Sequence, residues 1–199
     1  LLGMIQENFT YESVFRYLRS GYCEFTEDEI DRLENYCLAL GIKGYKKWQQ
    51  AWARKTKEAD EEEVEKLNHL RVKFVEKIDP LMFVSRQKKK TVLDITLAVY
   101  EFIAGEHLQE KLEQQQKFFA EQGELTLAKE YEQIYRIVME LFDKFSELLG
   151  DEPITLKEYC ELLDAGFEEA KVGVIPPCIV QVVIGDVERT RMKDIRALF

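Results

Sequence analysis

The sequence predicts a mainly α fold, a multi-helix and bundle-like arrangement followed by a small C-terminal β element. Apolar residues recur at helical spacing from Thr10 to about Ala170. Several of these periodic segments open with a threonine that is followed three residues later by an acid, which is the signature of a capped helix N-terminus. Only after Val172 does the pattern change to β character.

The first helices are short and end at glycines. Residues 14–18 form an apolar stripe that ends at Gly21. Thr26 and Glu29 then form a capping box, because the hydroxyl can accept a backbone N–H while the carboxylate reaches back to the N-cap. The helix that they open is predicted to end at Gly41.

Two further segments follow a tight turn. Residues 45–56 are predicted to resume a helix in which Trp48 and Trp52 lie one turn apart. Residues 60–79 begin with acids, which are favourable at a helix N-terminus, and continue with apolar residues at helical spacing. Pro80 suits the first turn of a separate, short helix.

The next segments are the longest. Thr91 and Asp94 open a periodicity that continues to Gly123, which predicts one long arm of a bundle. Residues 125–149 have the same character, and they are followed by a glycine and a proline that stop a helix.

Thr155 and Glu158 open the last predicted helix. Beyond it, the apolar run 179–184 and its possible partner 195–199 have β character. A buried strand needs neighbours, and the second run ends without a continuation. We therefore expect the chain to be an excised segment of something larger.

Composition indicates a soluble globular domain. The net charge of -10 argues against wrapping nucleic acid over the whole surface, although local basic patches remain possible. The cysteines are widely spaced and lack the pattern of a metal site, which fits a reducing cytoplasm. They are Cys23, Cys37, Cys160 and Cys178. Neither a signal peptide nor a membrane span is expected.

The motifs of common catalytic sites are missing from the sequence. It contains no phosphate-binding loop and no nucleophile elbow. His69 and His107 fall within helical patterns and are expected to be structural. The acidic runs are explained by solvation and by charge at helix N-termini, so that no metal site and no self-contained hydrolase is expected.

The stretch from Lys43 to Lys57 is the better of two nucleic-acid candidates. It has no acid, and its cations are Lys43, Lys46, Lys47, Arg54, Lys55 and Lys57. Tyr45, Trp48 and Trp52 are interleaved with them, so that cations could follow phosphates while aromatic faces stack on bases. The alternative is that both tryptophans anchor the segment to the core.

The second candidate is the cluster of Arg86, Lys88, Lys89 and Lys90, which lies between a helix end and the Thr91 cap. Cations there also complement the helix dipole without any ligand. A DNA-binding groove would be better supported if the two basic stretches lay on one face of the fold. The sequence alone does not show whether they do.

Several short segments of the chain match a known family in order and spacing: 12–18, 29–37, 39–44, 175–177 and 181–191. On these segments the chain resembles the AddB family, the B subunits of bacterial AddAB ATP-dependent helicase/deoxyribonucleases. The resemblance spans nearly the whole chain in the expected order, and the helices between residues 58 and 152 match mainly in pattern.

The resemblance implies a helical subdomain, residues 1–172, inserted into a superfamily-1 helicase-like domain. Residues 173–199 would re-enter the RecA-like sheet. In active helicases this re-entry carries a motif that couples nucleotide and DNA. The usual residues of that motif are absent here. Arg189 and Arg191 are therefore DNA-binding candidates without an expected role in ATP coupling.

The resemblance also implies DNA and the AddA subunit as partners, in the resection of double-strand breaks. ATP, magnesium and an iron–sulfur cluster are expected in other parts of the family's proteins, with no cofactor in this segment. The leading hypothesis is a non-catalytic, DNA-contacting or scaffold segment. The alternative is a helical protein-docking module without DNA contact.

Overall fold

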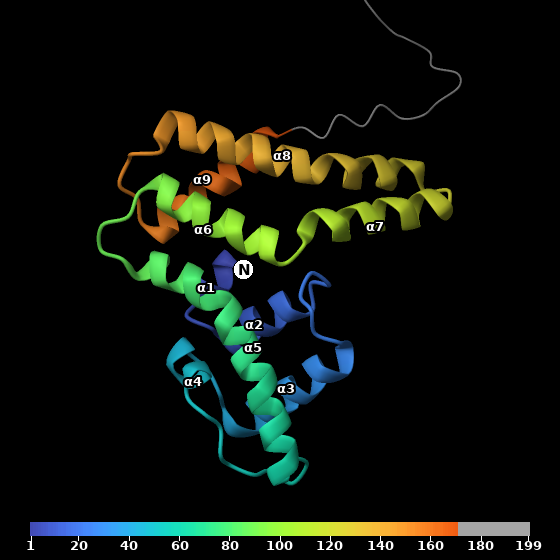
Figure 1. Ribbon diagram of the computed structural model, residues 1–199, viewed down its shortest axis with the longest axis vertical. Coiled ribbons are helices and arrows are strands. Elements are labelled where there is room, and N and C mark those ends of the chain that lie inside the picture. The colour runs from blue at the N-terminus through green and yellow to red at the C-terminus, as the bar shows by residue number, and fades with distance from the viewer. Residues whose placement is uncertain (171–199) are drawn as a thin grey trace, which may run out of the picture.

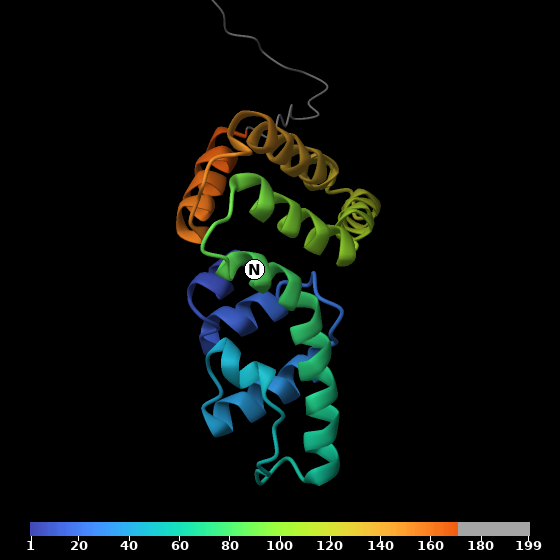
Figure 2. The same cartoon turned by 60° about the vertical axis from the view of Figure 1, so that its left-hand side comes forward.

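The computed structural model describes residues 1–170, and in this part the chain is mainly α, as predicted. The helices are α1 (Leu2–Gln6), α2 (Tyr11–Leu18), α3 (Glu27–Leu40), α4 (Tyr45–Gln49), α5 (Glu61–Arg86), α6 (Val92–Gly105), α7 (Leu108–Glu121), α8 (Leu125–Leu149) and α9 (Leu156–Glu169). Figures 1 and 2 show α1–α5 as one group and α6–α9 as a second group above it. The predicted β element lies outside the described residues.

The predicted capping signatures position the helices. Thr26, Thr91 and Thr155 each accept a backbone N–H from the third residue of α3, α6 and α9, and the acid at that position bonds back to the cap. Gly41 ends α3 with φ of 60°, a left-handed conformation that glycine adopts without strain. The start and end of α3 are therefore confirmed.

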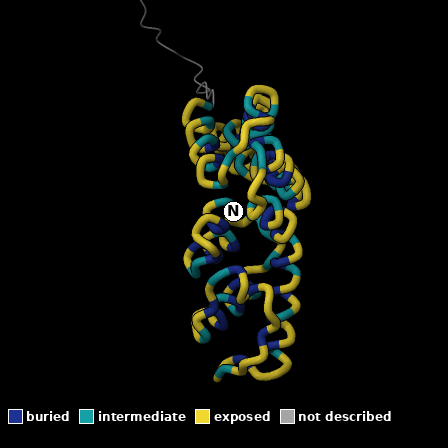
Figure 3. The backbone as a smooth tube through the Cα atoms, turned by 90° about the vertical axis from the view of Figure 1, so that its left-hand side faces the viewer, coloured by how far each residue is buried: buried dark blue, intermediate teal, exposed yellow. Residues whose placement is uncertain are grey.

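One hydrophobic core joins the two groups of helices. Most helices bury residues on one side and expose residues on the other, as Figure 3 shows and as amphipathic helices require. The helix α5 supplies much of this core, and α6 packs against both α5 and α8. Phe74 of α5 lies at its centre, beside the fully buried rings of Phe9 and Trp48.

The prediction of a helix over residues 45–56 is wrong in its second half. The helix α4 ends at Gln49, and Gln50 is already extended with ψ of 143°. The carbonyls of Lys47 and Trp48 accept hydrogen bonds from the Trp52 indole and from Arg71. Side-chain donors therefore replace the backbone donors that a longer helix would supply.

One predicted break is absent and one unpredicted break is present. Pro80 lies inside α5, which continues to Arg86 because Leu81 and Met82 still pack into the core. The predicted long arm is instead two helices, because His107 adopts φ of 53° between α6 and α7. This turn directs Glu106 toward the interior, where it is 5% exposed.

The helix predicted over residues 125–149 is confirmed as α8. It pairs with α7, and the two helices extend together beyond α6 in Figure 1. We call this pair the arm. Near its turn, Phe118, Leu125 and Leu127 are exposed.

Candidate nucleic-acid interface

The two tryptophans of the first basic stretch are core residues. Trp48 is 1% exposed and Trp52 is 8% exposed. The centroid of the Trp48 ring lies 4.8 Å from that of Phe74, and the Trp52 ring stacks on Tyr36 at 5.2 Å. Their faces are not available for stacking on bases. The structure instead supports the alternative interpretation, in which both tryptophans anchor the segment to the core.

A polar clamp holds the segment after α4 against α5. The Trp52 backbone N–H donates to Asn68 Oδ1 at 2.8 Å, and Asn68 Nδ2 donates to the Trp52 carbonyl at 2.6 Å. Arg71 Nη1 donates to the Trp48 carbonyl at 2.7 Å, and burial lowers the pKa of this guanidinium. The clamp satisfies backbone groups that no helix serves, and it fixes the path of the basic stretch.

The cations at the start of the stretch remain on the surface. Lys43, Lys46 and Lys47 are exposed. Lys47 Nζ donates to the carbonyl of Gly41 at 3.0 Å. Within residues 1–170, no acid lies within ion-pair distance of these three lysines. Their charges are therefore available to an anion.

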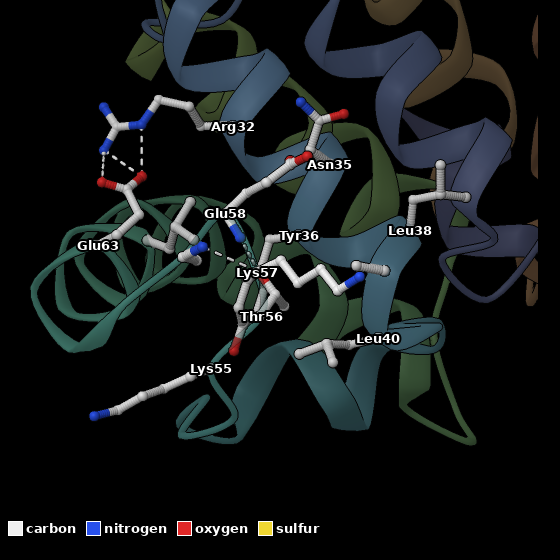
Figure 4. A pocket seen from close by; sticks show the side chains of 13 residues that line it. Arg32, Asn35, Tyr36, Leu38, Leu40, Lys55, Thr56, Lys57, Glu58 and Glu63 are labelled. Carbon is white, nitrogen blue, oxygen red and sulfur yellow. Dashed lines mark hydrogen bonds and ion pairs between the residues drawn. The ribbon is translucent and has the colours of Figure 1, made fainter.

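The end of the stretch is partly neutralised. Lys55 Nζ lies 2.8 Å from Glu61 Oε2, and the exposed Arg54 contributes its carbonyl to the Tyr36 hydroxyl at 2.7 Å. Lys57 lines a pocket of about 590 Å³ between this segment, α3 and α5. Figure 4 shows that the Lys55 side chain points away from the other lining residues of this pocket.

The same pocket contains a fixed ion pair. Arg32 donates through Nε and Nη2 to the two carboxylate oxygens of Glu63, at 2.6 and 2.7 Å, as the dashed lines of Figure 4 indicate. A bidentate pair of this kind leaves the arginine with little charge for another anion. The pocket is therefore a weaker anion site than the surface around Lys46.

The second basic cluster adjoins the first. The guanidinium carbon of Arg86, at the end of α5, lies 4.7 Å from the centre of the Tyr45 ring, at the start of α4. Lys88 and Lys89 follow in the exposed connection to α6. Lys90 differs from them because it is half-buried, and it donates to the carbonyl of Gln87 at 3.0 Å. We call the exposed cations Lys43, Lys46, Lys47, Arg86, Lys88 and Lys89 the basic surface.

An ion cluster around the buried Glu106 joins the two groups of helices. Glu106 Oε1 accepts a hydrogen bond from Lys77 Nζ at 2.6 Å, and Glu106 Oε2 lies 3.6 Å from Lys111 Nζ. Lys77 also lies 2.9 Å from Glu24, which Lys73 approaches at 3.5 Å. The cluster therefore connects the loop before α3 with α5, α6 and α7.

Comparison with known proteins identifies relatives along the whole chain. Proteins named as the B subunits of ATP-dependent helicase/deoxyribonucleases are 45% identical in Lachnoclostridium phytofermentans, 38% identical in Clostridium novyi and 39% identical in Alkaliphilus metalliredigens. Each match covers 100% of this chain. The predicted resemblance to AddB is confirmed. The chain spans 17–18% of the length of these relatives, and a scan against family models finds no match.

Two of the residues predicted to bind DNA in this AddB-like chain, Arg189 and Arg191, lie outside the described residues. The other candidates are the cations around α4 and after α5, together with the two buried tryptophans. In the structure Tyr45 of the first basic stretch contacts Arg86 of the second. The sequence alone could not predict this contact.

The titratable side chains of the described residues do not gather into a metal-binding group. Within residues 1–170, no group of three or more His, Cys, Asp or Glu side chains is placed to hold a metal ion. Burial raises the pKa of the Cys37 thiol to about 12, which makes it a poor nucleophile. His69 is exposed on α5 and His107 lies in the turn before α7. The same part of the chain contains no helix long and apolar enough to cross a bilayer.

Phe83 is the functional candidate that the sequence reasoning missed. It is 70% exposed on α5, beside the buried Leu81 and Met82. Its position one residue off the apolar stripe of α5 was a usable signal, because a helix with a buried face at residues 78, 81 and 82 turns residue 83 outward. Because a separate helix was predicted to begin at Pro80, the apolar periodicity was not followed across residues 78–83.

Proposed function

We propose that this chain is a non-catalytic, DNA-contacting segment of an AddB protein. The full-length protein would act in the resection of double-strand breaks during recombinational DNA repair. The match over the whole chain to proteins named as helicase/deoxyribonuclease subunits supports the assignment. The contact of Arg86 with Tyr45 is the observation that favours DNA contact, because it brings one residue of each basic stretch together.

The distribution of charge supports binding through one face. The chain has a net charge of -10, so most of its surface repels a polyanion. Among the described residues, the basic surface gathers three exposed lysines around α4 and three exposed cations after Ser85. We propose that DNA phosphates lie along these cations, and that the acidic remainder of the molecule keeps DNA on this face.

We further propose that residues 1–172 are a helical insertion and that residues 173–199 return to a RecA-like sheet. An inserted domain enters and leaves its host at neighbouring points. The packing of α1 against α9 agrees with this arrangement, because it places the first and last described helices side by side.

The remaining activities would belong to other parts of the full-length AddB protein. We propose that ATP and magnesium serve a helicase and nuclease function there, together with an iron–sulfur cluster, and that the AddA subunit is the obligate partner. The complex would work in the cytoplasm.

The test is direct measurement of DNA affinity with charge-reversed variants. The double variant Lys46→Glu and Lys47→Glu should abolish binding of the chain to labelled DNA in fluorescence anisotropy. The matched control reverses Lys129 and Lys144 of α8, which are equally exposed and change the net charge by the same amount. Equal losses in both double variants, or binding by neither the parent chain nor the control, would overturn the proposal.

A protein-docking module is the second candidate, and the arm favours it. Phe118 is 53% exposed and Leu125 is 51% exposed near the turn of the arm. Two packed helices leave such side chains without cover, and exposed apolar residues are frequent at protein interfaces. If Phe118→Ser and Leu125→Ser weaken association with the AddA subunit while DNA affinity is unchanged, docking is a function of the arm. If association is unchanged, the arm is not the docking site.

A further inference from the structure

Phe83 presents an aromatic face to solvent beside the basic surface. Its exposed fraction of 70% exceeds that of Phe118, the next most exposed aromatic side chain of the described residues. Burying Phe83 against its own core is excluded by the helix, because Leu81 and Met82 already occupy the buried side of α5. Covering a large water-exposed aromatic ring with another flat group is favourable, because it removes apolar surface from water.

Phe83 lines an open groove of about 740 Å³ between α4, the end of α5 and α6. This volume is within the range of clefts that hold small organic groups. Tyr45 and Arg86 line the same groove, and their contact at 4.7 Å forms one fixed wall. The Tyr45 hydroxyl donates to one carboxylate oxygen of Asp79, which holds the ring in place, and Asp79 also lines the groove.

Polar groups with both donors and acceptors face the groove. The amides of Gln49 and Gln87 line it from α4 and from the end of α5. Glu101 of α6 lines the opposite side, so that a phosphate would be repelled there while an amino group would be attracted. Arg86 lines the side of the groove formed by the end of α5. Lys88 and Lys89 are exposed and follow directly after Gln87, which also lines the groove.

We propose that this groove holds an unpaired nucleobase of single-stranded DNA, stacked on Phe83. The phosphates on either side of that nucleotide would lie on Arg86, Lys88 and Lys89, away from Glu101. Every base has a flat face that can stack on an aromatic ring, whereas the faces of bases inside a duplex are already covered. The proposal rests on the proposed function, and it identifies the DNA at this site as single-stranded.

The mixture of aromatic, amide and charged side chains around the groove favours a nucleotide over an apolar peptide. An apolar peptide would gain from Phe83 but would bury the charges of Arg86 and Glu101 without partners. A nucleotide uses the ring, the amides and the cations together, because it has a flat base with polar edges and an anionic backbone. Charge complementarity on the side of Arg86 therefore favours the nucleotide.

The experiment uses the whole chain and the substitution Phe83→Ala. Anisotropy titrations compare a labelled single strand with a blunt duplex of the same length. Affinity for the single strand should fall by about 5-fold to 100-fold, as expected for loss of one base–aromatic stack. Affinity for the duplex should change by less than about twofold. Leu148→Ala of α8 is the matched control, because that side chain is 77% exposed and lies on another helix.

A second variant reports stacking itself. Phe83→Trp should keep the affinity for single strands, and binding should quench the new tryptophan fluorescence, since Trp48 and Trp52 are buried and contribute a constant background. Unchanged affinity of Phe83→Ala, with binding still lost on reversal of Lys46 and Lys47, overturns the nucleobase site but leaves the proposed function. No DNA binding by the parent chain overturns both. A shared loss of single-strand and duplex affinity in Phe83→Ala, without quenching in Phe83→Trp, also overturns the nucleobase site.

Discussion

The guanidinium of Arg86 lies over the ring of Tyr45, with 4.7 Å between the guanidinium carbon and the ring centre. Tyr45 begins α4 in the first basic stretch, and Arg86 ends α5 at the start of the second. A cation over an aromatic face is attracted by the electrons of the ring. This contact brings together one residue from each of two basic stretches that are far apart in the sequence.

Loss of this contact should lower stability modestly. Arg86→Ala is expected to reduce the free energy of unfolding by about 0.5–1 kcal/mol, the typical value of an exposed cation–π pair. Arg86→Lys should lose less, because it keeps the positive charge. Urea denaturation followed by circular dichroism measures both. A stability of Arg86→Ala equal to that of the parent chain would show that the contact contributes nothing.

Removal of the Trp48 ring should be much more harmful. Trp48→Ala is expected to cost about 3–5 kcal/mol, because it leaves a cavity beside Phe74 in the core. Trp48→Phe fills part of that cavity and should cost less. Thermal unfolding of the three proteins tests the order. A loss below about 1 kcal/mol for Trp48→Ala would contradict burial of the ring and would make it available for base stacking again.

The capping box of α9 should be measurable by itself. Thr155 Oγ1 accepts the N–H of Glu158 at 3.2 Å, and Glu158 accepts the N–H of Thr155 at 2.8 Å. Thr155→Ala should cost about 1 kcal/mol, whereas Thr155→Ser keeps the hydroxyl and should be nearly neutral. The difference in urea midpoint between these two variants measures how much the capping hydroxyl contributes to stability. Equal midpoints would mean that water satisfies the free N–H groups at the start of α9 as well as the Thr155 hydroxyl does.

The ion cluster around Lys77 predicts a dependence of stability on pH. The hydrogen bond from Lys77, together with the charge of Lys73, lowers the pKa of Glu24 from 4.5. A carboxyl with a lowered folded pKa stabilises the fold above its unfolded pKa, and this contribution is lost as the pH falls through the folded value. Stability should therefore decrease on acidification below about pH 4.5.

Glu24→Gln should reduce that dependence, because the amide does not titrate. Urea midpoints measured from neutral into acidic solution compare the variant with the parent chain. Glu27→Gln is a suitable control, since Glu27 is exposed at the start of α3. Parallel pH profiles for the parent chain and Glu24→Gln would show that the Glu24–Lys77 pair does not contribute.

Local signals in the sequence predicted most helix boundaries correctly. The caps at Thr26, Thr91 and Thr155 depend on residues three positions apart, and Gly41 stops α3 through its own conformational freedom. Such signals need no knowledge of the rest of the fold. For this reason the mainly α class and the bounds of α3, α8 and α9 follow from the sequence.

The errors occur where contacts between distant residues decide the backbone. Arg71 and Asn68 of α5 take over the polar groups around Trp52, and so end α4 early. The pairing of Glu106 with Lys77 and Lys111 accompanies the turn at His107. The candidate site was predictable as two basic stretches, but neither their contact at Tyr45 nor the exposed Phe83 could be placed without α5.

The most direct test of DNA contact by the basic surface is the salt dependence of DNA affinity. Each phosphate contact on a single strand adds about -0.7 to the slope of log affinity against log salt concentration. The parent chain should therefore lose affinity steeply as salt is raised. Lys46→Ala with Lys47→Ala should flatten the slope by about 1.4, the value for two contacts, whereas Lys129→Ala with Lys144→Ala should leave it unchanged. Affinity that does not respond to salt, or a slope that both double variants flatten equally, would contradict the account.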